Sequence, residues 1–505
     1  MNIRPVVASV GLVFSMMVTQ VATAEATEKS TVSESNSRQT VQIEEAELAC
    51  LTESQRAFVK RLMAIPSHKR RGSFCVAPGT SQDYIDLLDR LMFADVDESQ
   101  RYEHANRWPG AQGSPFGLTY SFVPDGVAVP ADVGLPGGIN ELNSLLDGVF
   151  PSTAAWQDIF FESFETWGNL SGLSYAEVSD DGASLFGSAG SASRGDVRIA
   201  SIPLDGFNGV LAYNQFPTAE LGSSGGGDMV FDADDGPNWA NAANNHRFLR
   251  NTIMHEHGHG MGLMHVCPDN SSKLMEPAIN LNFVGPQLDD VRSAQRHYGD
   301  VFEPNDSTGA AHDLGAFHNR TDAYNDLSID DNSDNDVCAM TVGDNATLTA
   351  SVTPVGSTYQ SGAQGFLGCL FASTVNVNAL SIHNLDIALL DTDGSTTLVS
   401  AAGNGAGQSE SINGFAFPGA GTYFLQVSAS TSTNDIQLYD LDIEVGVPAG
   451  DGDADDDNDV DLEDFMVMQQ CVGPVSAGCG ALDTDADGDV DDGDLVGFVG
   501  ALVGP

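Results

Sequence analysis

The chain has 505 residues and a formal net charge of −51, from 71 acidic against 20 basic side chains. A length of this order predicts three or four domains, and the charge disfavours nucleic acid and anionic lipid as partners. We therefore expect no nucleic-acid partner and an affinity for divalent cations. For the middle of the chain, solubility alone explains the acidic composition equally well.

Residues 1–24 are typical of a secretory signal peptide. Arg4 precedes an apolar run from Val6 to Val18, and Ala22-Thr23-Ala24 forms a small-residue cleavage site. A membrane anchor needs about 20 apolar residues, more than this run supplies. We expect a secreted, extracellular protein whose mature chain has no transmembrane segment.

Residues 25–106 are expected to form an N-terminal pro-segment. A polar lead without apolar periodicity reaches about Glu47. Helical periodicity over residues 48–65 and 81–95 then predicts two helices. The basic cluster His68-Lys69-Arg70-Arg71 lies between them and is either a processing site or a solvated loop.

Residues 107–300 are predicted to form an α+β domain. Apolar patterns of period 2 and period 3.6 predict strands at 118–122, 196–200 and 228–231 and helices at 156–167, 245–261 and 288–298. The helix over residues 245–261 carries the motif that says most about function.

Residues 255–265 spell His-Glu-x-x-His-x-x-Gly-x-x-His, the pattern of a catalytic zinc site. His255 and His259 lie four residues apart, so one helix face can present both imidazoles to a metal. Gly262 lets the helix end, and His265 can then supply a third ligand. Three protein ligands leave a fourth position for water, so we expect one catalytic zinc ion.

Glu256 follows the first histidine, where its carboxylate is suited to act as a general base beside the metal. His257 points away from the metal face and is expected to be a surface or packing residue. A helix merely rich in histidine is the alternative. It is disfavoured because the whole chain has only 11 histidines, and four of them fall within this motif.

Residues 107–300 resemble a matrixin, a branch of the metzincin metalloproteases. Leu274-Met275-Glu276-Pro277 is similar to the family's Met-turn, which implies that Met275 packs beneath the metal. Stretches similar to the family's strand, acidic loop and closing helix are Gly209–Tyr213, Gly227–Asp232 and Leu288–Val291. The resemblance implies a zinc endopeptidase whose substrates are proteins or peptides.

The chain departs from the matrixin pattern at two positions. Tyr213 and Val230 stand where matrixins carry histidines of a structural zinc site, so we expect that second zinc to be absent. Asp232, Asp234 and Asp235 keep the acidic loop, which implies one calcium ion in the catalytic domain.

Cys75-Val76-Ala77-Pro78 loosely resembles the propeptide motif whose cysteine thiolate closes the zinc site of matrixin zymogens. The resemblance implies that Cys75 acts as a zymogen switch. A disulfide from Cys75 to Cys50 would use the same sulfur, so both alternatives stay open.

Residues 302–447 are predicted to form an all-β sandwich, because short alternating segments are separated by Gly and Asp turns. The opening Glu303-Pro304-Asn305-Asp306 and the closing stretch of residues 421–427 resemble the bacterial pre-peptidase C-terminal domain. The resemblance implies a module that accompanies secreted peptidases, either as a polymer binder or as a passive spacer.

Residues 450–505 carry a repeated pattern in which Asp residues fall at the ligand positions of an EF-hand calcium loop. The expected ligands are Asp453, Asp455, Asp457, Asp459 and Asp464 in the first loop and Asp483, Asp485, Asp487, Asp489 and Asp494 in the second. We therefore expect a small α tail that binds two calcium ions. It resembles a type I dockerin, which implies a cohesin-like or cell-surface scaffold partner.

Seven cysteines in an exported chain predict disulfides. The expected pairs are Cys471–Cys479, which are close in sequence, Cys338–Cys369, which share one module, and Cys50–Cys75. Cys267 is left without a partner.

The leading hypothesis is a secreted zinc metalloendopeptidase that hydrolyses extracellular proteins, with Glu256 as its general base. One alternative is a calcium-dependent, surface-attached binding or scaffold protein. Another is a dockerin-borne component of a polysaccharide-degrading assembly, for which the sequence shows no identifiable pair of glycosidase carboxylates.

Overall fold

A computed structural model of the chain describes residues 43–502, apart from 44, 71, 93–106, 132–134, 187–192, 218–225, 332, 344, 365–368, 370–371, 432, 434, 447–449, 451 and 456–459. The expected signal peptide and the expected calcium ligands Asp457 and Asp459 lie outside these residues. In the part of the chain that is described, every helix is too short or too polar to cross a membrane.

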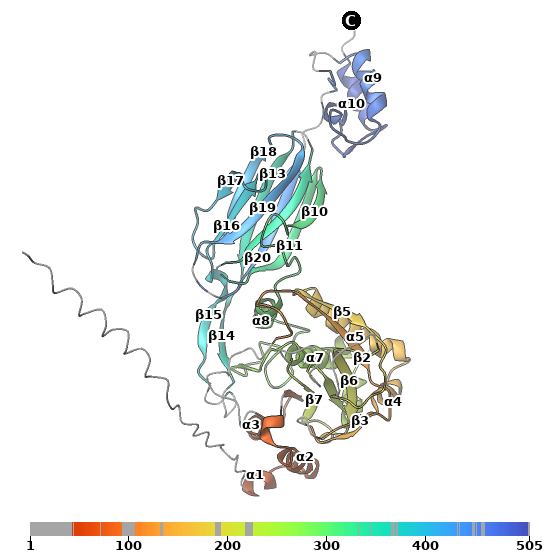
Figure 1. Ribbon diagram of the computed structural model, residues 1–505, viewed down its shortest axis with the longest axis vertical. Coiled ribbons are helices and arrows are strands. Elements are labelled where there is room, and N and C mark those ends of the chain that lie inside the picture. Colours follow the sequence, from red (N-terminus) through yellow and green to blue (C-terminus); the bar gives the residue numbers. More distant parts are fainter. Residues whose placement is uncertain are drawn as a thin grey trace, which may run out of the picture. The chain divides into compact units, whose positions relative to one another are not determined.

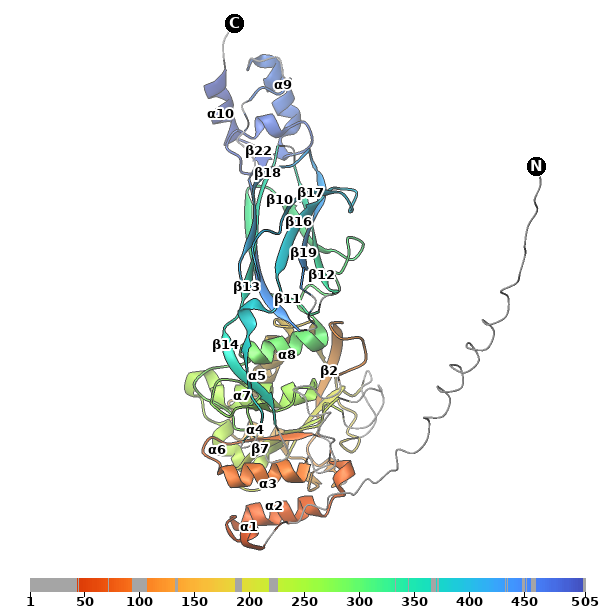
Figure 2. The same cartoon turned by 90° about the vertical axis from the view of Figure 1, so that its left-hand side faces the viewer.

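The N-terminal segment contains three helices and a short strand: α1 (Glu45–Ala49), α2 (Glu53–Met63), β1 (Ser73–Val76) and α3 (Gln82–Met92). The helix predicted over residues 48–65 is interrupted at Thr52, whose hydroxyl accepts the Gln55 N–H in a capping box that starts α2. Helices α2 and α3 lie side by side (Figure 2) and bury their apolar faces in a common core.

A six-stranded sheet lies at the centre of the next domain (Figure 1). Its strand order is β1-β7-β8-β6-β2-β5. Its other strands are β2 (Phe116–Phe122), β5 (Leu173–Glu177), β6 (Val197–Ile202), β7 (Val210–Asn214) and β8 (Met229–Asp232). Strands β5, β2, β6 and β8 are parallel, whereas β7 and β1 run antiparallel to their neighbours. Strands β6, β7 and β8 are buried along their whole length, as expected where both faces of a sheet are covered.

Two long helices pack together beside this sheet, α5 (Thr153–Gly168) and α7 (Ala243–Gly260). Helix α7 begins irregularly, because residues 244–246 have positive φ angles, which Asn tolerates better than most residues. Helix α8 (Leu288–Tyr298) spans the residues that were predicted to form the last helix. The shorter elements are α4 (Leu142–Asp147), α6 (Gly236–Trp239), β3 (Ala128–Val129) and β4 (Gly138–Ile139).

Two facing sheets form a β-sandwich over residues 312–446, as predicted. The five-stranded sheet contains β10 (His312–Phe317), β12 (Asn335–Val342), β19 (Gly421–Ala429), β16 (Leu385–Leu390) and β17 (Thr397–Ala401) in that order. The four-stranded sheet contains β11 (Arg320–Ile329), β20 (Gln437–Gly446), β13 (Thr347–Val355) and β18 (Glu410–Ala416). Alternate residues of β13 are buried, so one side chain in two enters the core between the sheets.

A hairpin of β14 (Thr358–Ala363) and β15 (Val375–Asn378) leaves the sandwich and pairs with β9 (Val266–Cys267), which directly follows the third motif histidine. A disulfide between Cys267 and Cys369 joins the same two regions. The predicted pairing of Cys338 with Cys369 is therefore wrong. Cys338 is buried and free, because its strand β12 is an inner strand of the sandwich, whereas the β14–β9 pairing brings Cys369 to Cys267.

The predicted Cys50–Cys75 disulfide is also wrong, since both cysteines are free. Cys50 is exposed after α1, whereas Cys75 is fully buried on β1. The Cys471–Cys479 disulfide is present, and it lies in a small core of the C-terminal tail. That tail holds α9 (Leu462–Cys471), β21 (Gly473–Pro474), β22 (Asp489–Val490) and α10 (Asp494–Ala501).

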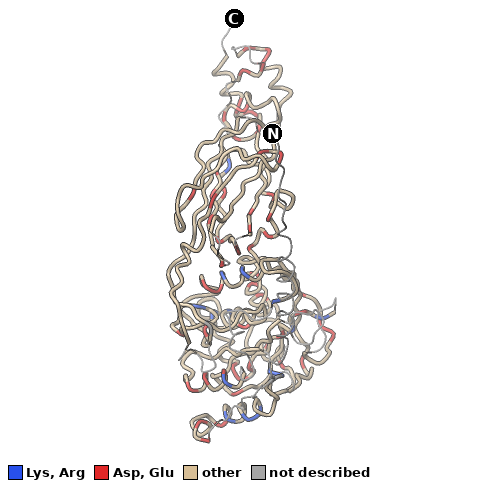
Figure 3. The backbone as a smooth tube through the Cα atoms, turned by 60° about the vertical axis from the view of Figure 1, so that its left-hand side comes forward, with Lys and Arg blue, Asp and Glu red and all other residues tan. Residues whose placement is uncertain are grey.

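Charge is distributed unevenly along the described chain. Figure 3 shows Asp and Glu throughout, whereas Lys and Arg gather in the N-terminal helices and in the domain of the six-stranded sheet. No Lys or Arg follows Arg320 in the sequence.

Candidate metal centre

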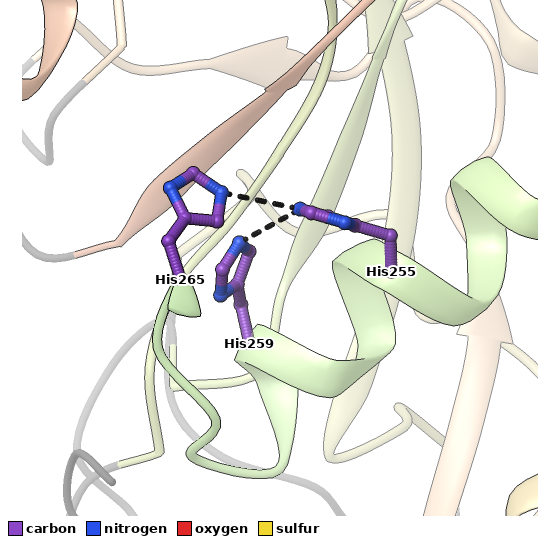
Figure 4. Close-up of side chains that lie close together, drawn as sticks. All are labelled: His255, His259 and His265. Atoms are coloured by element: carbon purple, nitrogen blue, oxygen red, sulfur yellow. Dashed lines mark hydrogen bonds between the residues drawn. The ribbon is translucent and has the colours of Figure 1, made fainter. Parts of the chain in front are cut away.

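Three histidine side chains converge at the C-terminal end of α7 (Figure 4). The Nε2 atom of His255 lies 3.1 Å from Nε2 of His259 and 3.2 Å from Nε2 of His265. All three rings are buried. Their nitrogens form the one group of three or more His or Cys ligand atoms within the described residues.

The second nitrogen of each ring is held by an oxygen atom. His255 Nδ1 lies 2.7 Å from the Leu274 carbonyl oxygen, and His259 Nδ1 lies 2.7 Å from that of Leu263. His265 Nδ1 lies 3.0 Å from Oε1 of Gln364. Each Nδ1 therefore carries the proton, and three unprotonated Nε2 atoms face one another.

Such a donor set fits a zinc ion, because neutral imidazoles with inward lone pairs repel one another unless a cation lies between them. Burial lowers the pKa of His255 to about 4, and it lowers the pKa values of His259 and His265 well below their usual range. The rings are therefore in the neutral form that binds metals. The structure thus brings together the three histidines that the sequence predicted as zinc ligands.

The local backbone explains this convergence. One turn of α7 separates His255 from His259, and Gly262 has a φ of 105°, at which the chain reverses towards His265. Met275 lies against the helix, since a Cβ atom at Gly258 would overlap with the Met275 sulfur. A glycine at this position of α7 is what lets Met275 pack beside the metal ligands.

Asp290 on α8 positions the Met-turn. No role was predicted for this residue from the sequence. Its Oδ2 accepts the Leu274 N–H at 2.7 Å, and its Oδ1 accepts the Met275 N–H at 3.0 Å. Burial, reinforced by the neighbouring Asp289, raises the pKa of Asp290 to about 7. Since Leu274 also holds His255, Asp290 indirectly supports a candidate metal ligand.

Glu256 is fully buried beside the histidine cluster. Its Oε1 accepts the backbone N–H of Cys75 at 2.9 Å, and its Oε2 has no hydrogen-bond partner among the described residues. Burial raises the pKa of Glu256 to about 8. A carboxyl group with this environment is suited to exchange protons near neutral pH.

The Cys75 thiol does not join the metal ligands. It lies at Glu256 and is absent from the histidine group of ligand atoms, within the residues that the structure describes. Burial, and then the Glu256 carboxylate, raise the pKa of Cys75 well above its usual value. The structure therefore does not place Cys75 as the zinc-closing thiolate that the resemblance implied.

His257 belongs to the core rather than to the surface. Its ring is buried, and its Nε2 lies 2.8 Å from the Tyr175 hydroxyl on β5. Burial lowers its pKa to about 3. Of the two alternatives from the sequence, His257 is a packing residue.

Tyr213 and Val230, which replace the histidines of a structural zinc site, are both fully buried among apolar side chains. The acidic loop after β8 is not arranged as a ligand group. Asp232 instead accepts backbone N–H groups of Leu204 and Asp234, at 3.0 and 2.9 Å. Among the described residues, the predicted calcium ligands Asp232, Asp234 and Asp235 are not gathered into a cluster.

Gln364 is a second residue of the site that sequence reasoning did not identify. It follows β14, and besides contacting His265 its Nε2 donates to Asp89 on α3. Its buried amide thus joins a candidate metal ligand to the N-terminal segment. A contact between residues so far apart in sequence leaves no local pattern.

The tail gathers part of the two predicted calcium ligand sets. Asp453, Asp455 and Asp464 form one carboxylate group, and Asp483, Asp485 and Asp494 form another, each with ligand atoms within 4.8 Å of one another. Asp487 and Asp489 lie outside the second group. The Asp494 carboxylate already accepts the Thr484 N–H at 2.6 Å, which orders the loop around it.

A further carboxylate group was not predicted: Glu303, Asp306 and Asp334, at the start of the sandwich. They line a hollow of about 150 Å³ together with Asp330. Burial raises the pKa values of Glu303 and Asp334 to about 8 and about 9.

Comparisons with known proteins match the two central domains. Residues 150–299 match the family described as Matrixin, and residues 372–429 match the bacterial pre-peptidase C-terminal domain. These matches support a matrixin domain followed by a pre-peptidase C-terminal domain.

Similar curated proteins include two interstitial collagenases and a stromelysin. The collagenase of Equus caballus is 35% identical over 146 residues, 28% of this chain and 28% of that protein. The collagenase of Oryctolagus cuniculus is 34% identical over 151 residues, 29% of each chain. Stromelysin-3 of Mus musculus is 29% identical over 139 residues, 27% of this chain and 26% of that protein. The chain spans less than a third of the length of these relatives.

One similar solved structure is the pre-peptidase C-terminal domain of a collagenase from Bacillus anthracis. It is 17% identical, with coverage of 26% of this chain and 94% of that one, and a TM-score of 0.17.

Proposed function

We propose that the chain is a secreted zinc metalloendopeptidase, with zinc held by His255, His259 and His265. The observation that supports this most strongly is the convergence of three buried, unprotonated Nε2 atoms beside a buried carboxyl group. The match of this domain to the matrixins supports the same activity. A zinc ion at this site would acidify a water molecule and polarise a scissile carbonyl group.

Glu256 acts as the general base in this proposal. It accepts a proton from the attacking water and delivers it to the leaving amine. Its Oε1 accepts the backbone N–H of Cys75 at 2.9 Å, and this contact with a peptide nitrogen supports the proposed role. Met275 does no chemistry and shapes the floor of the site through its contact with Gly258.

The substrates proposed are extracellular proteins, because residues 1–24 predict secretion. Gelatin is a suitable test substrate, since relatives of this domain are named collagenases. We expect the chain to bind one zinc ion at the histidine site and to digest gelatin or casein only when zinc is bound. Atomic absorption measures the bound zinc. If freshly loaded protein contains zinc but digests neither gelatin nor casein, the proposal is contradicted.

A calcium-dependent docking role for the tail is a second candidate function. It is supported by the two carboxylate groups around Asp464 and Asp494 and by the dockerin-like repeat. The proposed partner is a cohesin-like or cell-surface scaffold protein. If the chain captures a cohesin domain in the presence of calcium and without zinc, docking is separate from proteolysis. If it captures none at any calcium concentration, the docking role is contradicted.

A further inference from the structure

The strand β1 lies between two segments of the catalytic domain. On one side it pairs antiparallel with β7, with Phe74 opposite Tyr213 and Cys75 opposite Ala212. On the other side Val76 exchanges hydrogen bonds with the segment after Met275: its N–H donates to the Pro277 oxygen, and its oxygen accepts the Ile279 N–H, each at 3.1 Å. Main-chain hydrogen bonds to an extended segment are a recurring way in which proteins bind a peptide.

One peptide bond of β1 faces the catalytic groups with both of its polar atoms. The Phe74 carbonyl lies within hydrogen-bond reach of the His265 imidazole, and the Cys75 N–H donates to Glu256 Oε1 at 2.9 Å. Hydrolysis requires the carbonyl at the metal and the leaving nitrogen at the general base. The Phe74–Cys75 bond has its nitrogen at the proposed general base, and its carbonyl group lies beside His265, one of the three candidate zinc ligands.

The neighbouring side chains are also accommodated. The Phe74 ring packs on Tyr213 with ring centroids 5.1 Å apart, and on Phe58 of α2 at 5.6 Å. Cys75 is fully buried in the main core of the catalytic domain. The site therefore accepts an aromatic side chain before this bond and a small one after it.

The rest of the N-terminal segment keeps β1 in place. Tyr84 on α3 donates to Asp205 at 2.8 Å, Arg61 on α2 donates to the Leu204 oxygen at 2.7 Å, and Asp89 accepts from Gln364. These contacts lie on both sides of β1 in the sequence. The strand is thus presented to the active site by its own chain.

We propose that the Phe74–Cys75 bond is the enzyme's own first substrate and is hydrolysed within the same chain once zinc is bound. This inference rests on the proposed function. In this inference the active site is closed by the backbone of β1 in the substrate position, rather than by a Cys75 thiolate on the metal. Cleavage would give a mature chain that begins at Cys75.

The reaction needs only water as a co-reactant. A water oxygen forms a bond to the Phe74 carbonyl carbon, and the C–N bond to Cys75 breaks. One water proton passes through Glu256 to the Cys75 nitrogen, which leaves as an amine. The other water proton is released from the new Phe74 carboxyl group.

The test adds zinc to the metal-free full-length protein and follows its intact mass and its N-terminal sequence. We expect complete conversion to two fragments, with a new amino terminus at Cys75 and the same rate at every chain concentration. The Cys75→Ser variant is expected to be cut at the same bond, because the strand geometry does not need the thiol. Glu256→Gln should stay intact, and Cys50→Ser, which lies outside β1 at an exposed position, should behave as wild type.

A second measurement does not depend on activity. In metal-free Glu256→Gln protein, iodoacetamide is expected to label the exposed Cys50 quickly and to spare Cys75 until the protein unfolds. Rapid labelling of Cys75 would show that β1 is not seated and would overturn the inference.

Further outcomes distinguish this inference from the proposed function. Digestion of casein by a protein whose Phe74–Cys75 bond stays intact, or is cut elsewhere such as after Arg70 or Arg71, would overturn the inference alone. Failure of zinc-loaded protein to digest casein, with the Phe74–Cys75 bond also intact, would contradict both proposals. Cleavage at Phe74–Cys75 without any digestion of casein would contradict only the proposed digestion of other proteins.

Discussion

The Nδ1 atom of His265 lies 3.0 Å from Oε1 of Gln364, which is 99 residues further along the chain. The β-sandwich therefore supplies a residue that orients a candidate zinc ligand. The disulfide between Cys267 and Cys369 and the pairing of β9 with β14 hold the two regions together around this contact.

Replacement of Gln364 by Ala should weaken zinc binding. His265 would lose the acceptor that fixes its tautomer, and loss of such an outer partner typically costs about 10- to 100-fold in metal affinity. Competition with a chromogenic chelator measures the change. Gln360→Ala, at an exposed position of β14, the strand that precedes Gln364, is the matched control. Equal zinc affinity of the two variants would show that the contact does not position His265.

Substitution of Gly258 by Ala should destabilise the catalytic domain. The new Cβ atom would overlap with the Met275 sulfur, and overpacking of this kind costs about 1–3 kcal/mol. Urea unfolding measures the loss. Gly500→Ala in α10 is the control, because its Cβ atom would have no neighbour within 4 Å and should stabilise the helix slightly. Unchanged stability of Gly258→Ala would contradict the packing of Met275 on the helix.

The stability of the N-terminal segment should depend on pH through Asp205. Burial raises the pKa of this carboxyl group to about 8, and Tyr84 donates to it at 2.8 Å. In the unfolded chain an Asp has a pKa of about 3.9. The folded state thus keeps a proton that the unfolded state loses, so this contribution to stability is full below about pH 4 and is lost as the pH rises towards 8.

Thermal unfolding between pH 5 and pH 8 (roughly the window between those two pKa values) tests this dependence in metal-free protein. Asp205→Asn should flatten the decline in melting temperature, whereas Asp158→Asn, at an exposed position of α5, should keep it. An equal slope in the wild type and Asp205→Asn would show that another group dominates.

Calcium binding by the tail should depend on Asp494. This carboxylate belongs to the second acidic group, and it is buried and already oriented by the N–H of Thr484. The Asp494→Asn variant is expected to bind one calcium ion fewer than the wild type in titration calorimetry. Asp492→Asn, at an exposed neighbouring position, should not change the stoichiometry. Equal stoichiometry for all three proteins would contradict the loop assignment.

The sequence predicted those parts of the site that depend on local spacing. His255 and His259 are one helical turn apart, and Gly262 permits the turn to His265, so the motif alone was enough to expect their convergence. Helix α8 and strands β2, β6 and β8 likewise followed from apolar periodicity.

The features that were missed depend on contacts between distant segments. Strand β1 has only four residues, and its extended form follows from pairing with β7 rather than from a pattern of its own. Gln364 and the partner of Cys267 come from a hairpin of the sandwich, whose addition to β9 cannot be inferred from spacing. For the same reason the sequence drew attention to the thiol of Cys75 and not to its backbone N–H, which also contacts Glu256.

The central claim is that the histidine cluster and Glu256 form a hydrolytic zinc centre. The most direct measurement compares casein digestion by zinc-loaded wild type and Glu256→Ala, with bound zinc determined in both proteins. Both should bind zinc, and the variant should lose at least about 100-fold in rate, because it lacks the general base. Digestion at the wild-type rate by the zinc-loaded variant would contradict the account.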